Sequence, residues 1–252
     1  MSTDTQEFDE LLSKLQEQHD TSQLDIYLPS DSKTVKSKKI TVDQQSLILA
    51  GAITQETRQN VFSYNRVISE IILKNCSDPE NINLIDKIPL AIQYRIDTIG
   101  DTMDLNGDTI QLTDHLQSVY QLVEPKLQGI LESHEHITDT GVTIVYSCPP
   151  LFIDYDVNSS AEKKWSSLQG EDIISELFKV EMSKYIQQVS FQEEVIPVME
   201  LDFESRMKVC NILPMSCSKV LVEFIESVKS VENLYVSVSG NDIPMDATLF
   251  GS

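Results

Sequence analysis

The sequence has few of the residues and motifs on which many catalytic sites depend. Only 8 glycines occur among 252 residues, which leaves little room for glycine-rich loops that cradle phosphate groups. Gly-x-Ser-x-Gly, Walker, Rossmann and protein-kinase motifs are absent. These absences favour a protein that binds other proteins over an enzyme. We therefore expect no catalytic residues, no cofactor and no small-molecule substrate.

Cysteine is also scarce. The chain has four cysteines, at positions 76, 148, 210 and 217, too few and too scattered for a disulfide scaffold. Cys210 and Cys217 have the spacing of neither a zinc knuckle nor a redox CxxC pair. His134 and His136 could present two imidazoles on one face of a strand to zinc, but no CxxC or HExxH motif accompanies them. A solvated polar loop is favoured there, and we expect no metal site.

Basic residues are outnumbered by acidic ones. The chain contains 40 acidic and 19 basic residues, for a formal net charge of −21, whereas nucleic-acid binding relies on Lys and Arg that displace counterions. Nucleic acid is therefore not expected as a partner. No run of about eighteen apolar residues occurs, so no membrane span is expected either. The N-terminus is acidic and has no apolar h-region, which predicts synthesis in the cytosol.

Residues 1–39 differ from the rest of the chain and are expected to form an N-terminal arm. Four apolar residues recur at i, i+3, i+4 and i+7 within acidic surroundings, and they predict a short amphipathic helix: Phe8, Leu11, Leu12 and Leu15. We interpret them as candidate partner-binding residues, with a helix folded back on its own body as the alternative. Four lysines between positions 33 and 39 indicate a solvated linker, or else a contact with an acidic protein surface.

Residues 40–252 are expected to form the folded body, with a possible subdivision near 140–170. Thr41 and Gln44 have the spacing of a capping box at the start of a first helix. A second helix is predicted over 58–75, so that the two form a helical hairpin, and a third over 86–99, with Pro89 in its first turn.

Turn residues then predict strand pairs between the later helices. Asn106-Gly107 is the strongest two-residue hairpin signal. Aspartates flank this turn, but the loop from Thr102 to Thr113 has neither the first carboxylate nor the final Glu of a calcium-binding EF-hand. Residues 113–140 are expected to be helical, 141–147 a strand and 151–170 an irregular surface segment. A helix over 171–187 and a hairpin over 189–198 follow.

The C-terminal region is predicted as a helix followed by a hairpin. Four apolar residues form one helical stripe after Pro214: Leu221, Phe224, Ile225 and Val228. Leu234, Val236 and Val238 alternate with polar residues, which indicates a strand before the turn at Gly240. The expected fold class is α+β, with a mainly helical body and short antiparallel β-hairpins between helices.

Six segments carry a family resemblance, with a terminal strand expected between the last two: KKITVDQQSLILAG, FSYNRVISEIILKN, LIDKIPLAIQYRIDTIG, GVTIVYSCPPL, NILPMSCSKVLVEFIESV and IPMDATLF. This succession, over residues 38–252, resembles the baseplate hub subunit and hub-assembly protein family of T4-like contractile-tailed bacteriophages. The resemblance implies a non-enzymatic assembly factor that binds other phage baseplate hub proteins in the host cytoplasm. A permanent structural subunit of the hub in the virion tail and an unrecognised enzyme remain alternatives.

Overall fold

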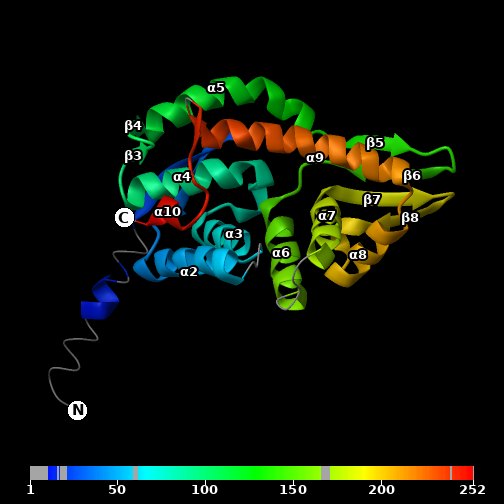
Figure 1. Cartoon of the computed structure of the whole chain (residues 1–252), viewed down its shortest axis with the longest axis horizontal. Helices are drawn as coiled ribbons and strands as arrows, with labels where there is room; N and C mark the ends of the chain where they lie inside the picture. Colours follow the sequence, from blue (N-terminus) through cyan, green and yellow to red (C-terminus); the bar gives the residue numbers. More distant parts are fainter. Residues whose placement is uncertain are drawn as a thin grey trace, which may run out of the picture.

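Helices form most of the molecule, and short antiparallel strand pairs connect them, so the expected α+β class is confirmed (Figure 1). The computed structural model describes residues 11–15, 17, 22–58, 62–165, 171–238 and 240–251. Its labelled helices are α2 (Val42–Arg58), α3 (Ser63–Asn75), α4 (Lys87–Thr98), α5 (Leu112–Leu131), α6 (Leu151–Trp165), α7 (Glu171–Tyr185), α8 (Phe203–Ile212), α9 (Met215–Val236) and α10 (Ala247–Phe250). Its strands are β1 (Gln23–Leu28), β2 (Lys33–Lys38), β3 (Thr102–Leu105), β4 (Asp108–Gln111), β5 (His134–Ile137), β6 (Val142–Tyr146), β7 (Ile186–Phe191), β8 (Glu194–Pro197), β9 (Ser237–Val238) and β10 (Asn241–Asp242).

The long helix α9 runs along two groups of elements (Figure 1). On the left of this view lie α2, α3, α4, α5 and α10, and on the right lie α7, α8 and the sheet β5-β6-β7-β8, with α6 between. Helix α9 packs against α4 and α5 and also against α7. One large core cluster therefore extends from β1 to α10. The possible subdivision near 140–170 stays a prediction.

The hairpin β1–β2 belongs to the body. Ile26 and Leu28 of β1 and Val35 of β2 are buried in the main core, because alternate strand residues point to the same face. Two lysines of β2 pair with acids, Lys33 with Asp78 at 3.1 Å and Lys36 with Asp25 at 2.5 Å. The expected solvated linker ending at residue 39 is therefore wrong, and the body begins before residue 40.

The first two body helices form the predicted helical hairpin. The backbone N–H of Gln44 donates to Thr41 Oγ1, and Thr41 N–H donates to Gln44 Oε1, each at 3.1 Å, which is the expected capping box. A Cβ added at Gly51 of α2 would lie 3.3 Å from Val67 Cγ2 of α3. The small residue therefore lets the two helices approach closely.

The sheet β5-β6-β7-β8 is antiparallel and carries α9 on one face. The Phe224 ring of α9 contacts Tyr146 of β6 and His134 of β5, with ring centroids 5.1 Å apart in both pairs. His134 therefore lies in a strand that packs against a helix, and the favoured solvated loop is wrong. The predicted helix over 113–140 ends earlier, at Leu131, and strand β5 begins at His134.

The segment expected to be irregular, 151–170, contains helix α6. Its residues Ile153, Val157 and Ala161 recur at i, i+4 and i+8 and are buried in a second core cluster with Phe203 of α8. The prediction failed because Asp154 and Asn158 are buried on the same side of the helix, so polar residues interrupt the apolar stripe in the sequence.

The C-terminal helix starts after Pro214 as predicted but ends later than expected. Its stripe Leu221, Phe224, Ile225 and Val228 is buried and continues through Val231 and Tyr235. The expected strand beginning at Leu234 is therefore wrong, because the period of 3.6 residues carries the helix to Val236 and buries Tyr235. Strands β9 and β10 pair over two residues each. The chain then packs back through Ile243, Leu249 and Phe250.

Candidate functional site

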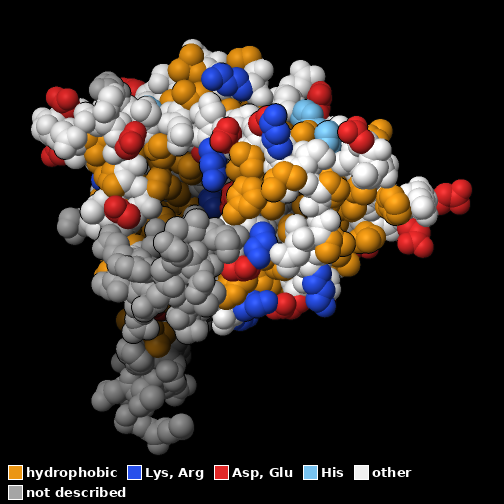
Figure 2. All heavy atoms as spheres, turned by 45° about the vertical axis from the view of Figure 1, so that its right-hand side comes forward, with side chains coloured by type: hydrophobic (Ala, Val, Ile, Leu, Met, Phe, Trp, Pro, Cys, Tyr) orange, Lys and Arg blue, Asp and Glu red, His pale blue; other side chains and the backbone are white. Residues whose placement is uncertain are grey.

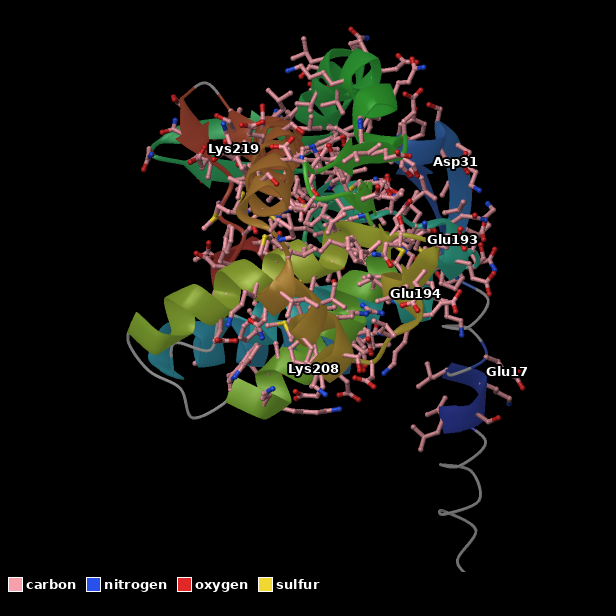
Figure 3. The ribbon with its side chains drawn as sticks, turned by 90° about the vertical axis from the view of Figure 1, so that its right-hand side faces the viewer. Glu17, Asp31, Glu193, Glu194, Lys208 and Lys219 are labelled. Carbon is pink, nitrogen blue, oxygen red and sulfur yellow. The ribbon has the colours of Figure 1, made fainter. Side chains whose placement is uncertain are left out.

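The predicted partner-binding residues lie on a short helix outside the body. Residues 11–15 are helical, and Leu11, Leu12 and Leu15 are 47–55% exposed. Figures 1 and 3 show this helix standing apart from the folded core, with Glu17 close by. Phe8, the fourth predicted member, falls outside the described residues. The structure thus brings three of the four predicted residues together on one exposed helix.

A second group of exposed apolar residues lies at the far end of the sheet. Its members come from β5, β7 and β8: Ile137, Phe191, Val195 and Ile196. Strand β8 is an edge strand whose four residues are all exposed. Figure 2 shows apolar side chains gathered over this end of the molecule, with acidic side chains at its tip. Figure 3 labels Glu193 of the β7–β8 turn and Glu194, the first residue of β8.

Charged side chains from four helices gather around a cavity of about 350 Å³. Its lining residues come from α3, η3 (Leu84–Asp86), α4, α6, α7, α9 and the C-terminal segment: Tyr64, Asn65, Ile68, Leu84, Lys87, Ile88, Asp154, Glu181, Lys184, Lys229, Glu232 and Met245. Asp154 of α6 is fully buried. Lys87 Nζ lies 2.9 Å from Asp154 Oδ2, and Lys184 Nζ lies 2.9 Å from Oδ1.

Two of the carboxylates are held in the ionised form. Burial alone would raise the pKa of Asp154, but the ammonium groups of Lys184 and Lys87 outweigh it and hold this pKa below its ordinary value. Burial likewise opposes ionisation of Glu181, but Lys184, whose Nζ lies 2.8 Å from Glu181 Oε2, lowers the pKa of Glu181. The same two acids outweigh the effect of burial on Lys184 and raise its pKa.

Glu232 of α9 behaves differently from its neighbours. Burial raises the pKa of its carboxyl to about 7, with an opposing effect from Lys87 and a reinforcing one from Glu181. The carboxyl therefore changes its protonation state near neutral pH. This combination of fixed ion pairs with one titrating acid gives the cavity a charge that depends on pH.

The other candidates from the sequence do not gather into a site. All four cysteines are free and buried, and burial raises the pKa of the Cys76 thiol to about 11 and of the Cys210 thiol to about 12, which keeps both protonated at neutral pH. His134 Nε2 lies 2.7 Å from the carbonyl oxygen of Gly129. Among the described residues, no group of three or more His, Cys, Asp or Glu side chains could hold a metal ion.

Within the described part of the chain, none of the helices combines the length and apolar character needed to cross a bilayer.

Sequence reasoning found the exposed leucines but missed the charged cavity. The leucines follow one helical period within a few residues, whereas the cavity residues are spread from Tyr64 to Met245. The one local signal was a charged residue inside an apolar stripe, as with Asp154 between Ile153 and Val157. No family model matches the chain, and no curated protein and no solved structure is significantly similar to it.

Proposed function

We propose that this protein is a baseplate hub assembly protein of a T4-like contractile-tailed bacteriophage. It acts without catalysis, by binding other hub proteins. The observation that carries the proposal is the exposure of Leu11, Leu12 and Leu15 on a helix that stands apart from the body. The sequence resemblance over residues 38–252 supplies the phage context.

The exposed helix suits docking in a groove of another protein. Full burial of a leucine side chain is worth about 1.5–3 kcal/mol, and these three side chains are about half exposed. Burial of the remaining surface would therefore contribute about 1 kcal/mol for each leucine. A helix of this length is marginal in isolation, so a partner groove would stabilise both its conformation and its apolar side chains.

The charge of the chain restricts the chemistry of such a partner. The leucines are surrounded in sequence by Glu7, Asp9, Glu10 and Glu17, within a chain of net charge −21. An apolar groove with Lys or Arg at its rim would complement this helix and steer its approach, whereas an acidic rim would repel it. We therefore expect the hub partner to present a basic rim.

The test replaces Leu11 and Leu12 with Asp and measures binding to co-expressed hub proteins in a pull-down. We expect the double variant to lose the partner and to block tail assembly when its gene replaces the natural one. The matched control replaces Val42 and Leu47, two exposed apolar residues of α2, with Asp. Loss of binding in the control but not in the leucine variant would contradict the proposal.

Mass spectrometry of purified virions separates an assembly factor from a permanent hub subunit. An assembly factor is absent from the mature particle, whereas a structural subunit is present in it at fixed stoichiometry. We expect absence. If the protein is present in virions at fixed stoichiometry, it is a structural subunit and not an assembly factor. The leucine helix would then be a contact between subunits of the hub.

A further inference from the structure

Two buried hydrogen-bond donors near the ion pairs of the charged cavity have no partner in the described part of the chain. Asp154 and Glu181 are occupied by Lys87 and Lys184. Tyr64 Oη and Asn158 Nδ2 are buried and have no hydrogen-bond partner among the described residues. A buried donor without a partner costs about 1–3 kcal/mol. A network that served only to stabilise the fold would not be expected to leave two such groups in one region.

Lys229 adds a third donor at the exposed side of the same region. It lines the cavity together with Tyr64, and it lines an adjoining cavity of about 240 Å³ together with Asn158. Lys229 is an exposed residue of α9. Its ammonium helps to lower the pKa of Glu181 through charge attraction, and within the described chain it makes no direct ion pair or hydrogen bond. The two cavities also share Glu181 and Lys184. The Tyr64 hydroxyl and the Asn158 amide therefore border two adjoining cavities, and Lys229 lines both of them.

We propose that this region binds a small ligand with an anionic oxygen group, a carboxylate or a phosphate, through Lys229, Tyr64 and Asn158. All three groups can donate hydrogen bonds, so the ligand must supply acceptors. The lysine contributes charge, which makes its hydrogen bond to an anion stronger than a neutral one. Binding would satisfy both buried donors.

The size and charge of the cavity fit such a ligand. A volume of about 350 Å³ lies at the small end of the range of about 300–1,000 Å³ found for ligand pockets. Three lysines and three acids line the cavity: Lys87, Lys184, Lys229, Asp154, Glu181 and Glu232. The cavity is thus formally neutral although the whole chain carries −21, and it becomes positive whenever Glu232 is protonated.

Protonation of Glu232 should therefore accompany binding. The charged groups that face it come from α4, α6 and α7: Lys87, Asp154, Glu181 and Lys184. A bound anion would add negative charge and favour the protonated carboxyl further. The affinity of the cavity for an anion should accordingly fall as the pH rises through neutrality.

The experiment titrates the full-length protein with succinate and, in a parallel arm, with inorganic phosphate, followed by calorimetry and NMR. We expect saturable binding of one or both, with a Kd of about 1 mM. Lys229→Gln and Tyr64→Phe should each raise that Kd by about tenfold. The control is Lys219→Gln, an exposed lysine of the same helix, labelled in Figure 3, which should leave the Kd unchanged.

Each outcome decides the proposal. Saturable binding of succinate alone assigns a carboxylate ligand, and binding of phosphate alone assigns a phosphate ligand. Absence of saturable binding of both probes at about 20 mM overturns the proposal, as does an equal loss of affinity in the Lys219→Gln control, since that result indicates general surface attraction. Tyr64→Phe keeps the aromatic ring and Lys229 is exposed, so a wild-type thermal melt is expected for both variants.

Discussion

The two ends of the described chain carry short apolar helices with opposite environments. Near the N-terminus, Leu11, Leu12 and Leu15 are 47–55% exposed, whereas Leu249 and Phe250 of α10 are 0% exposed. Helix α10 packs against α2 and α4, and the Gln45 side chain donates a hydrogen bond of 2.8 Å to the Phe250 carbonyl oxygen. Both ends are therefore apolar in composition. They differ because the body offers the C-terminal helix a surface, formed by α2 and α4, on which to pack.

The largest expected effect is the loss of the C-terminal anchor. Phe250→Ala should lower the free energy of unfolding by about 3–5 kcal/mol, because it removes a fully buried ring and leaves a cavity. Denaturant unfolding of the variant measures this loss. Ile212→Ala, at an exposed position, is the control and should change stability little. Equal stability of the Phe250 variant and the wild type would show that α10 is not an anchor.

The next effect concerns the charged cavity, which the C-terminal segment borders through Met245. The folded-state pKa of Glu232 is raised from 4.5 to about 7, so its contribution to stability is present below about pH 4.5 and is lost as the pH rises through 7. Glu232→Gln removes this dependence. As the pH rises from about 5 to about 8, the free energy of unfolding of the wild type should fall by about 2 kcal/mol relative to that of the variant.

Thermal and denaturant unfolding at both pH values measure this change. Glu223→Gln, at an exposed position of the same helix, is the matched control and should show no such dependence. If the stability difference between wild type and Glu232→Gln is the same at both pH values, the carboxyl does not titrate near neutrality in the folded protein.

A smaller effect is expected from the hydrogen bond that ties α10 to α2. Gln45→Ala should cost about 1 kcal/mol, the typical net contribution of one hydrogen bond. Equilibrium unfolding measures the loss, with Gln121→Ala on the exposed face of α5 as the control. If the two variants are equally stable, the bond contributes nothing to holding the C-terminal helix.

The smallest effect on stability is expected at the N-terminal helix. Leu11→Asp with Leu12→Asp should change the free energy of unfolding by less than about 0.5 kcal/mol, because both side chains are exposed. A thermal melt tests this directly. A lowered melting temperature with partner binding retained would instead favour the alternative that this helix packs on its own body.

Local signals in the sequence predicted the starts of helices and the tight turns. The capping box at Thr41 and Gln44 depends on residues three apart. The hairpin at Asn106-Gly107 depends on two adjacent residues, and both have the positive φ angles, 53° and 94°, that the turn requires. Such features depend on the chain within a few residues, so a sequence alone can specify them.

Features that depend on distant packing could not be predicted. Residues 23–38 read as a linker because their lysines are conspicuous, whereas their place in the body depends on Ile26, Leu28 and Val35 meeting the main core. The charged cavity depends on side chains from separate helices. The polar residues Asp154 and Asn158 also made α6 resemble a surface segment in the sequence. The exposed leucines could be found because they lie within a single helical period, although only the structure shows that they stand apart from the body.

The course of α9 along both groups of elements has a consequence for how the protein opens. Phe224 packs on rings from β6 and α7 in one group, and Tyr235 lies near Tyr120 of α5 in the other, with ring centroids 6.1 Å apart. Neither group can separate without exposing one side of this helix. The backbone amides at the centre of α9 should therefore exchange hydrogen with solvent only through global unfolding, which makes both groups one cooperative unit.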